Sequence, residues 1–294
     1  MFSSTLMGQL IFDGLAMGLV YVILATGLVL ITSVNRILFM AYGIFYTIGA
    51  YTTWYLMHTF DLPYVVSLVL AVLGSFLLGV ICYILIFQHL QKLEEGFLAT
   101  LIASAGLNMV LSQGDLLVYG TVSQGIPNVF KGTIYLFGIS MTVAKLALIV
   151  IGVAITVLLF LIYEKTKVGR AMRTVAFLPE IASLQGINTN RIYLVTMGAG
   201  TAVAGIAGAI LAPTYGLSPS MGSNILWSVM LMTMLGGMDS LLGAMAGGIV
   251  IGQLLSFGQY YIGSSIQIVI FIFIGIVLYF KPNGLLGRGI DIGI

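Results

Sequence analysis

The feature that most constrains this chain is the spacing of its charged residues. Seven long runs carry no charge: residues 14–35, 37–60, 62–91, 96–114, 146–163, 192–238 and 240–280. A charged side chain is costly inside a lipid bilayer, and about 20 apolar residues cross the bilayer as one helix. Each of the first five runs fits one crossing and each of the last two fits two, so the sequence predicts nine membrane-spanning helices. The run 192–238 is predicted to break at Pro213 and Pro219, and the run 240–280 near Gly263-Ser264-Ser265.

The composition also indicates a membrane protein. Hydrophobic residues make up 60% of the 294 residues and charged residues only 7%, whereas soluble domains carry about 25% charged residues. A soluble fold of this length would lack the polar side chains to cover its surface. We therefore predict an all-α, polytopic transmembrane helical bundle that forms one domain over residues 1–294. Residues 224–238 form the shortest predicted segment, and a broken or re-entrant helix there would leave eight crossings.

The basic residues predict how the bundle is oriented. Threading nine spans puts nine of the 11 basic residues on one side: Arg36, Lys92, Lys165, Lys167, Arg170, Arg173, Arg191, Lys281 and Arg288. Only Lys131 and Lys145 fall on the other side. Because cytoplasmic loops carry an excess of Lys and Arg, the first side is predicted to be cytoplasmic, with the N-terminus outside and the C-terminus inside. Residues 164–191 then form a cytoplasmic loop, and residues 115–145 form an external one.

No motif for catalysis or cofactor binding occurs in the sequence. No lysine follows a glycine, so the P-loop that binds nucleotide phosphates is absent. Cys82, the single cysteine, and the histidines His58 and His89 make no metal-ligand set, and no nucleophilic triad is recognisable. We expect no catalytic residue, metal or cofactor in this chain. Asp13 and Asp239 lie near predicted span ends rather than in mid-membrane, so the energy for transport is expected to come from elsewhere.

Small residues recur at a spacing of four within the predicted spans. The pairs are Gly14/Gly18, Ala204/Gly208, Gly243/Gly247 and Gly248/Gly252. Such pairs let helix backbones approach closely in lipid, so they predict tight helix packing rather than direct contact with a solute.

The predicted cytoplasmic loop carries a local helix signal. Pro179 is tolerated in a first helical turn, Glu180 favours a helix N-terminus, and Gly186 accepts the left-handed conformation that ends a helix. A short helix of about two turns is therefore predicted between them, held by two spanning helices. Such a helix can transmit force from a soluble partner. The alternative is an ordinary basic loop that only sets orientation.

Several segments resemble known transporter sequences. Glu180-Ile181-Ala182, with Gly186 beyond, resembles the Glu-Ala-Ala-x-x-x-Gly loop of bacterial ABC-importer permeases, with Ile181 in place of the first Ala. Other segments resemble the permeases of the branched-chain amino-acid uptake family: Gly169–Arg173, Gly186–Asn188, Leu235–Ser240 with Gly243-Ala244, and Lys281–Gly287. One segment departs from the family, since Phe39-Met40-Ala41-Tyr42-Gly43 stands where Asn-Phe-Ala-His-Gly is frequent.

The resemblance implies a permease subunit of an ATP-driven importer in the bacterial inner membrane. It implies three kinds of partner besides lipid: a second, homologous permease, two cytoplasmic ATP-binding subunits and an external solute-binding protein. ATP would be bound by those partners, and no nucleic acid is expected. The residues expected to couple this chain to the ATPases are Gly169, Arg170, Arg173, Glu180, Ala182 and Gly186.

Uncharged polar residues are the candidates for the translocation path. They are Ser104, Asn108, Gln113, Asn224, Gln253 and Gln267, each of which could instead hydrogen-bond between helices. A weakly polar path suits a small neutral or zwitterionic solute, above all a branched-chain or hydrophobic amino acid. Urea or a short amide ranks second and a sugar third. The remaining alternatives are a stand-alone secondary transporter or channel and a purely structural membrane subunit.

Overall fold

The computed structural model describes residues 4–93, 95–125, 132–136 and 139–287. The chain forms two compact units. The first contains residues 1–29, 127–157 and 228–294, and the second contains residues 30–126 and 158–227. Residues 94, 131 and 288, which carry three of the charges used in the sequence analysis, lie outside the described residues.

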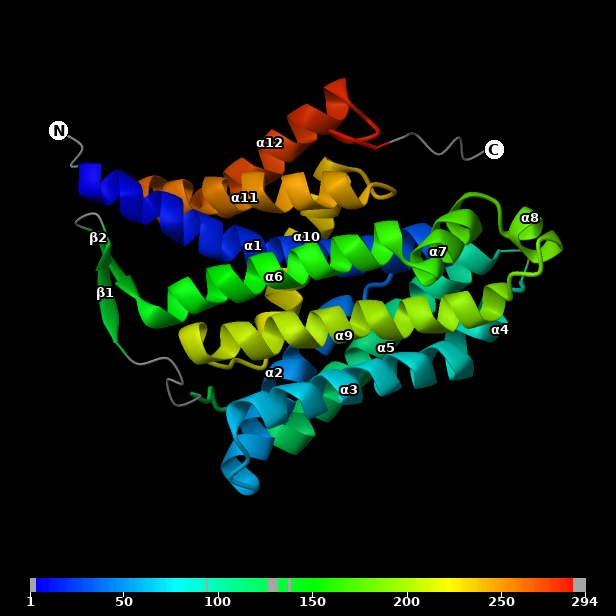
Figure 1. Cartoon of the computed structure of the whole chain (residues 1–294), viewed down its shortest axis with the longest axis horizontal. Coiled ribbons are helices and arrows are strands. Elements are labelled where there is room, and N and C mark those ends of the chain that lie inside the picture. The colour runs from blue at the N-terminus through cyan, green and yellow to red at the C-terminus, as the bar shows by residue number, and fades with distance from the viewer. Residues whose placement is uncertain (1–3, 94, 126–131, 137–138, 288–294) are drawn as a thin grey trace. The chain divides into compact units, whose positions relative to one another are not determined.

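Each charge-free run contains one or two helices, as predicted (Figure 1). They are α1 (Ser4–Asn35), α2 (Tyr42–Thr59), α3 (Tyr64–Cys82), which continues through a π-helical turn η1 (Tyr83–Phe87) and α4 (Gln88–Leu90), α5 (Gly96–Tyr119), α6 (Val143–Lys165), α9 (Thr189–Tyr215), α10 (Met221–Gly236), α11 (Leu241–Ile262) and α12 (Ile266–Phe280). Two further short helices, α7 (Lys167–Phe177) and α8 (Pro179–Leu184), lie in the predicted cytoplasmic loop.

Six helices in the described part of the chain are long and apolar enough to cross a membrane. They are α1 from Leu6, α3 together with η1 and α4, α5, α6, α9 and α11. The helix α2 is not among them because tyrosine and threonine lower its hydropathy, and α10 and α12 are apolar but shorter. Nine crossings and their orientation therefore stay predictions.

The expected all-α fold needs one correction, in the segment 115–145. Strands β1 (Thr133–Leu136) and β2 (Ile139–Thr142) pair antiparallel, with Thr133 opposite Thr142. The segment is also shorter as a connection than predicted, since α5 continues to Tyr119 and α6 begins at Val143. Residues 126–131 and 137–138 of this segment lie outside the described residues.

The long charge-free runs break at glycines. Pro213 and Pro219 were predicted to divide the first of these runs. Helix α9 passes through Pro213 and has Tyr215 as its last residue, followed by Gly216, whose φ of 75° is left-handed. Pro219 lies in the connection between α9 and α10, as predicted. The left-handed conformation of the glycine stops the helix. The second run divides as predicted, at a 3₁₀ turn over Gly263–Ser265.

In the first unit, α1 packs against α11 through facing glycines. A Cβ atom on Gly252 would lie 2.6 Å from the backbone nitrogen of Gly18, so only glycine permits this approach. Ser256 of α11 donates a hydrogen bond of 2.7 Å to the carbonyl of Leu10. At the start of α6, Lys145 forms an ion pair of 2.7 Å with Asp13 of α1. The small-residue spacing therefore predicted this packing correctly.

The tail of the first unit returns to the end of α10. The backbone N–H groups of Leu285 and Leu286 donate to the carbonyls of Leu235 and Gly236, at 2.7 and 3.1 Å. These carbonyls belong to the last turn of α10, where no intrahelical donor is available. The tail thereby satisfies the helix end.

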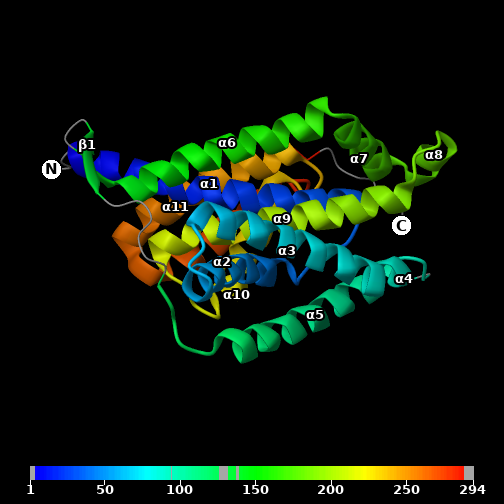
Figure 2. The same ribbon diagram turned by 60° about the horizontal axis from the view of Figure 1, so that its bottom comes forward.

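In the second unit, α2, α3 and α9 lie side by side (Figure 2). A Cβ atom on Gly49 of α2 would lie 2.7 Å from the carbonyl carbon of Gly205 in α9. A Cβ atom on Gly205 would lie 2.5 Å from Oγ of Ser75 in α3. Thr201 of α9 also donates a hydrogen bond of 3.0 Å to the Ser75 carbonyl. Helix α9 is thus in close contact with both neighbours at one level.

This packing predicts a selective effect of added bulk. Gly205→Val should destabilise the protein by about 1–3 kcal/mol, because overpacking at a backbone contact forces the helices apart. The thermal unfolding midpoint of the detergent-solubilised protein should fall and the folded yield should drop. The matched control is Gly106→Val on α5, where no atom lies within 4 Å of the added Cβ. Equal midpoints for the two variants would contradict the proposed role of Gly205.

Candidate functional site

The predicted short helix is present in the loop 164–191. Helix α7 (Lys167–Phe177) begins at Thr166, whose hydroxyl accepts a hydrogen bond of 3.0 Å from the N–H of Gly169. Helix α8 (Pro179–Leu184) follows, with Pro179 at its first position and an acidic residue in its first turn. Gly186 follows the C-cap residue Gln185 of α8 and has a φ of 78°, as a helix-ending glycine should.

One face of this loop is anchored in an apolar cluster. Ala182 of α8 is fully buried and packs with Met172 and Val175 of α7 and with Val34 at the end of α1. Gly169 is buried against the last turns of α6, where an added Cβ would meet backbone carbonyls. Ala182 and Gly169, two of the predicted coupling residues, therefore seat the loop on the spanning helices.

The two predicted arginines of the loop behave differently. Arg173 forms an ion pair of 3.1 Å with Glu164, donates to the carbonyl of Tyr163 and lies 5.3 Å above the centre of the Tyr163 ring. It therefore fastens α7 to the end of α6. Arg170 is exposed, and Glu180 is exposed in the first turn of α8, so both are open to a partner.

A third arginine, Arg36, belongs to this site and was treated in the sequence only as a marker of orientation. Its guanidinium donates to the carbonyls of Ala176 and Phe177, at 3.2 and 3.1 Å, where α7 ends. A cation at a helix C-terminus is favourable because the last carbonyls lack donors. The sequence holds no signal for a contact between residues 140 positions apart.

Two of the predicted path residues make structural hydrogen bonds. Ser104 is buried on α5, donates to the Leu38 carbonyl at 3.1 Å and accepts from the N–H of Met40 at 3.2 Å. Gln253 of α11 donates to the Ile11 carbonyl at 3.1 Å. For these two residues the alternative interpretation, hydrogen bonding between segments, is what the contacts support.

The other four predicted path residues are less enclosed. Asn108 is half-buried on α5, whereas Gln113, Asn224 and Gln267 are exposed. Within the described part of the chain, no hydrogen bond joins any two of the six side chains. They stay candidates for the path.

A buried acid on α5 was missed by the sequence analysis. Asp115 was taken as the end of a span, but it lies in the last turns of α5 and is only 6% exposed. Its Oδ1 atom has no hydrogen-bond partner among the described residues. The available signal was Tyr119, four residues later, since residues i and i+4 share a helix face.

Residues 10–281 match the family model described as "Branched-chain amino acid transport system / permease component". The chain belongs to this family. It is 26% identical to the high-affinity branched-chain amino acid transport system permease protein LivH of Salmonella typhimurium, over 95% of each chain. The corresponding protein BraD of Pseudomonas aeruginosa is also 26% identical over 95% of each chain. The probable permease protein LivH of Methanocaldococcus jannaschii is 28% identical over 83% of this chain and 78% of that protein.

In this permease the segment that departs from the family motif is part of the core. Phe39 is 1% exposed, and its ring centre lies 5.7 Å from that of Phe45 and 5.6 Å from that of Phe87. Tyr42 is buried as well. The substitutions at residues 39–43 therefore fill a packed interior with aromatic rings.

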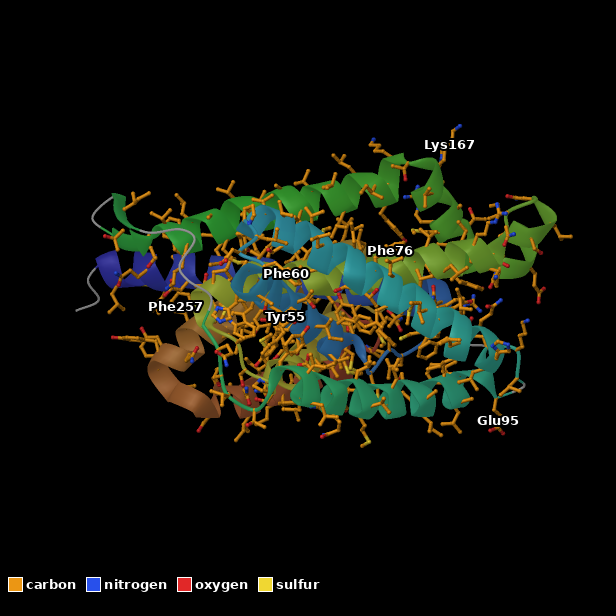
Figure 3. All side chains as sticks on the ribbon, turned by 90° about the horizontal axis from the view of Figure 1, so that it is seen from below. Tyr55, Phe60, Phe76, Glu95, Lys167 and Phe257 are labelled. Carbon is orange, nitrogen blue, oxygen red and sulfur yellow. The ribbon has the colours of Figure 1, made fainter. Side chains whose placement is uncertain are left out.

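Four large apolar side chains are exposed at residues 177–184 of the α7–α8 loop of the permease. We call this group the apolar corner, which consists of Phe177, Leu178, Ile181 and Leu184. Leu184 is 87% exposed, the largest exposed fraction among these four side chains. Lys167, at the start of α7, points away from the helices (Figure 3). A contiguous apolar surface beside exposed charges is typical of a protein-binding site.

The contacts of the two arginines predict different variant effects. Arg173→Ala should loosen α7 from α6, because it removes the ion pair and two hydrogen bonds to backbone carbonyls. Cleavage of the loop 164–191 by trypsin or chymotrypsin should become several-fold faster. The control is Arg170→Ala, which removes an exposed side chain of the same type. If both variants are cleaved at the wild-type rate, Arg173 does not hold the loop.

Proposed function

We propose that this permease is the translocating subunit of an ATP-driven importer for branched-chain and similar hydrophobic amino acids in the bacterial inner membrane. Its family supports the substrate class, because the matched relatives are named for the transport of branched-chain amino acids. A urea or short-amide permease is the second candidate. A stand-alone secondary transporter or channel is the alternative of a different class.

The importer would contain four kinds of subunit. This permease would pair with a second, homologous permease, receive solute from an external binding protein and contact two cytoplasmic ATPases. ATP and its hydrolysis would belong to the ATPases, since this chain has no P-loop and is expected to carry no cofactor or catalytic residue of its own. The energy of transport would reach the permease through protein contact.

The observation that supports this proposal is the way in which the α7–α8 loop packs on the spanning helices. Ala182 and Gly169 seat it against spanning helices, while the apolar corner and Glu180 face outward. Arg173 fastens α7 to α6, and the loop continues through Gly186 into α9. A partner that grips the apolar corner would therefore move the ends of α6 and α9 together, which suits transmission of an ATPase movement.

The solute path would be weakly polar. The run 192–280 carries a single charge, Asp239, so it offers no ion pair for a charged solute. Desolvating an ion costs far more than desolvating a polar group that keeps its hydrogen bonds. A zwitterion with an apolar body suits such a path, and most of the selectivity would lie with the external binding protein.

The proposed topology has nine crossings, with the loop 164–191 inside and residue 123 outside. Single cysteines at the exposed positions Ser123 and Lys167, in a Cys82→Ala background, should respond differently to a membrane-impermeant maleimide. The cysteine at 123 should be labelled in intact spheroplasts, and the cysteine at 167 only after permeabilisation. The background protein should stay unlabelled. Labelling of position 167 in sealed cells would overturn the threading.

Uptake by the reconstituted complex tests the function. Proteoliposomes that hold the permease with its co-purified partners, supplied with binding protein and ATP, should accumulate leucine, isoleucine or valine. Urea should accumulate far less, and a non-hydrolysable ATP analogue should stop uptake. Leucine uptake by the permease alone would favour a secondary transporter. Transport of a dicarboxylate or polyamine, with none of leucine, would rule out the proposed substrate class.

Two variants at one position test the coupling route in the same assay. Gly186→Val should cut ATP-driven uptake at least 10-fold while membrane insertion continues, because a β-branched residue is strained at a φ of 78°. Gly186→Asn is the matched control, since Asn tolerates the left-handed region and should keep most of the uptake. Full uptake by the Val variant would reduce the loop to an orientation signal.

A further inference from the structure

Asp115 is a buried carboxylate for which the described residues provide no counter-charge. It lies near the C-terminal end of α5, is 6% exposed and has a fully buried Oδ1 atom with no hydrogen-bond partner among the described residues. The ion pairs found in that part of the chain join Lys145 to Asp13 and Arg173 to Glu164, so neither involves Asp115. An ionisable side chain in a membrane-spanning helix is a candidate functional group unless a partner accounts for it.

A second buried polar atom without a partner belongs to the same region. Tyr51 of α2 is fully buried, and its hydroxyl group has no hydrogen-bond partner among the described residues. Its ring stacks on the ring of Tyr119, with 5.0 Å between the ring centres. Because Tyr119 follows Asp115 by four residues, these two side chains lie on one face of α5. Tyr51 of α2 packs against that face by stacking on Tyr119.

Aromatic side chains of α2 extend this region. Tyr55 makes an edge contact with Tyr119 at 6.1 Å between ring centres, and Trp54 makes one with Tyr51 at 6.5 Å. Thr52 and Tyr119 share a hydrogen bond of 3.4 Å between their hydroxyl oxygens. Figure 3 labels Tyr55, which belongs to α2. One carboxylate, one unpaired hydroxyl and several aromatic rings are thus brought together.

The chemistry of this group selects its ligand. A buried carboxylate without a partner is unfavourable, and a proton or a cation would relieve it. A proton would leave the Tyr51 hydroxyl unpaired and the aromatic rings without a role. A metal cation would require several more oxygen ligands. A primary ammonium has three N–H donors and is attracted to aromatic faces, so it can use the carboxylate, the hydroxyl oxygen and the rings together.

We propose that Asp115, with Tyr51 and Tyr119, binds the primary ammonium group of a solute that passes through the permease. The inference rests on the proposed function for the identity of that solute, an amino acid with an apolar side chain. In the proposed topology these residues lie at the outward end of α5, where solute released by the binding protein first meets the permease. The site would hold one end of the zwitterion before it enters the weakly polar path.

Chemical protection of Asp115 tests binding without any need for transport. Dicyclohexylcarbodiimide modifies carboxylic acids in apolar surroundings, and mass spectrometry measures the fraction of the Asp115 peptide that stays unmodified. The sample is the wild-type complex in nanodiscs. We expect 3-methylbutylamine and leucinamide, which carry an ammonium group and no carboxylate, to slow modification at least three-fold. The acid 4-methylpentanoate should not. Asp13, paired with Lys145, is read in the same digest as the internal control.

Each outcome of the protection experiment decides the proposal. Slower modification by the two amines alone supports an ammonium site. Equal protection by the acid, no protection by any solute, or no modification of Asp115 at all would each overturn it. The result does not depend on ATP, on the binding protein or on uptake. The proposed importer function can therefore fail in the uptake assay while the ammonium site stands, and the reverse also holds.

A pair of variants adds a functional readout. Asp115→Asn keeps the shape of the side chain and removes its charge. It should lower leucine uptake at least 10-fold while ATP hydrolysis stimulated by the loaded binding protein stays within about two-fold of wild type, and Asp115→Glu should restore part of the uptake. The control is Asp61→Asn, an exposed acid just after α2. Wild-type uptake by Asp115→Asn would overturn the proposal. If that variant fails to assemble, the protection experiment on the wild type decides.

Discussion

The cost of a charge in hydrocarbon governs the arrangement of this chain. Within the described residues, charged side chains lie between the spanning helices or toward the helix ends. Two ion pairs join such residues: Lys145 with Asp13, and Arg173 with Glu164. The same constraint concentrates basic residues in the loop 164–191, where two arginines differ in their contacts. Arg173 holds the loop to α6, and Arg170 remains open to a partner. Asp115 is the exception, because it is buried in α5 and no ion pair involves it among the described residues.

Much of the fold could be predicted because its signals are local. Charge-free runs locate the spanning helices, and Pro179 with Gly186 sets the bounds of α8. These features depend on the cost of burying charge and on backbone stereochemistry, which act within a few residues. The number of crossings could not be fixed in the same way. The helix α2 has the length of a short span, but its tyrosines and threonines lower its hydropathy. Most of its residues are buried against other parts of the protein.

The rest depends on contacts between distant segments, which a single sequence does not reveal. Arg36 reaches the end of α7, and Ser104 hydrogen-bonds to the connection before α2. The hairpin of β1 and β2 was missed because its residues were expected to form an irregular external loop. Asp115 was read as a boundary because charge usually ends a span, and only its neighbours Tyr51 and Tyr119 show that it is enclosed.

The glycine contact between α2 and α9 has a mechanical consequence. In most helix pairs the side chains of one helix pack into grooves of the other. These interlocked side chains resist displacement along the helix axis, because sliding would make them clash. At Gly49 and Gly205 the backbones face each other with no side chain between them, so this stretch of the surface is nearly smooth. A smooth contact allows small axial sliding without opening a void, which is the shear type of rearrangement. The residues that bring these helices closest together thus also present the least resistance to their relative motion.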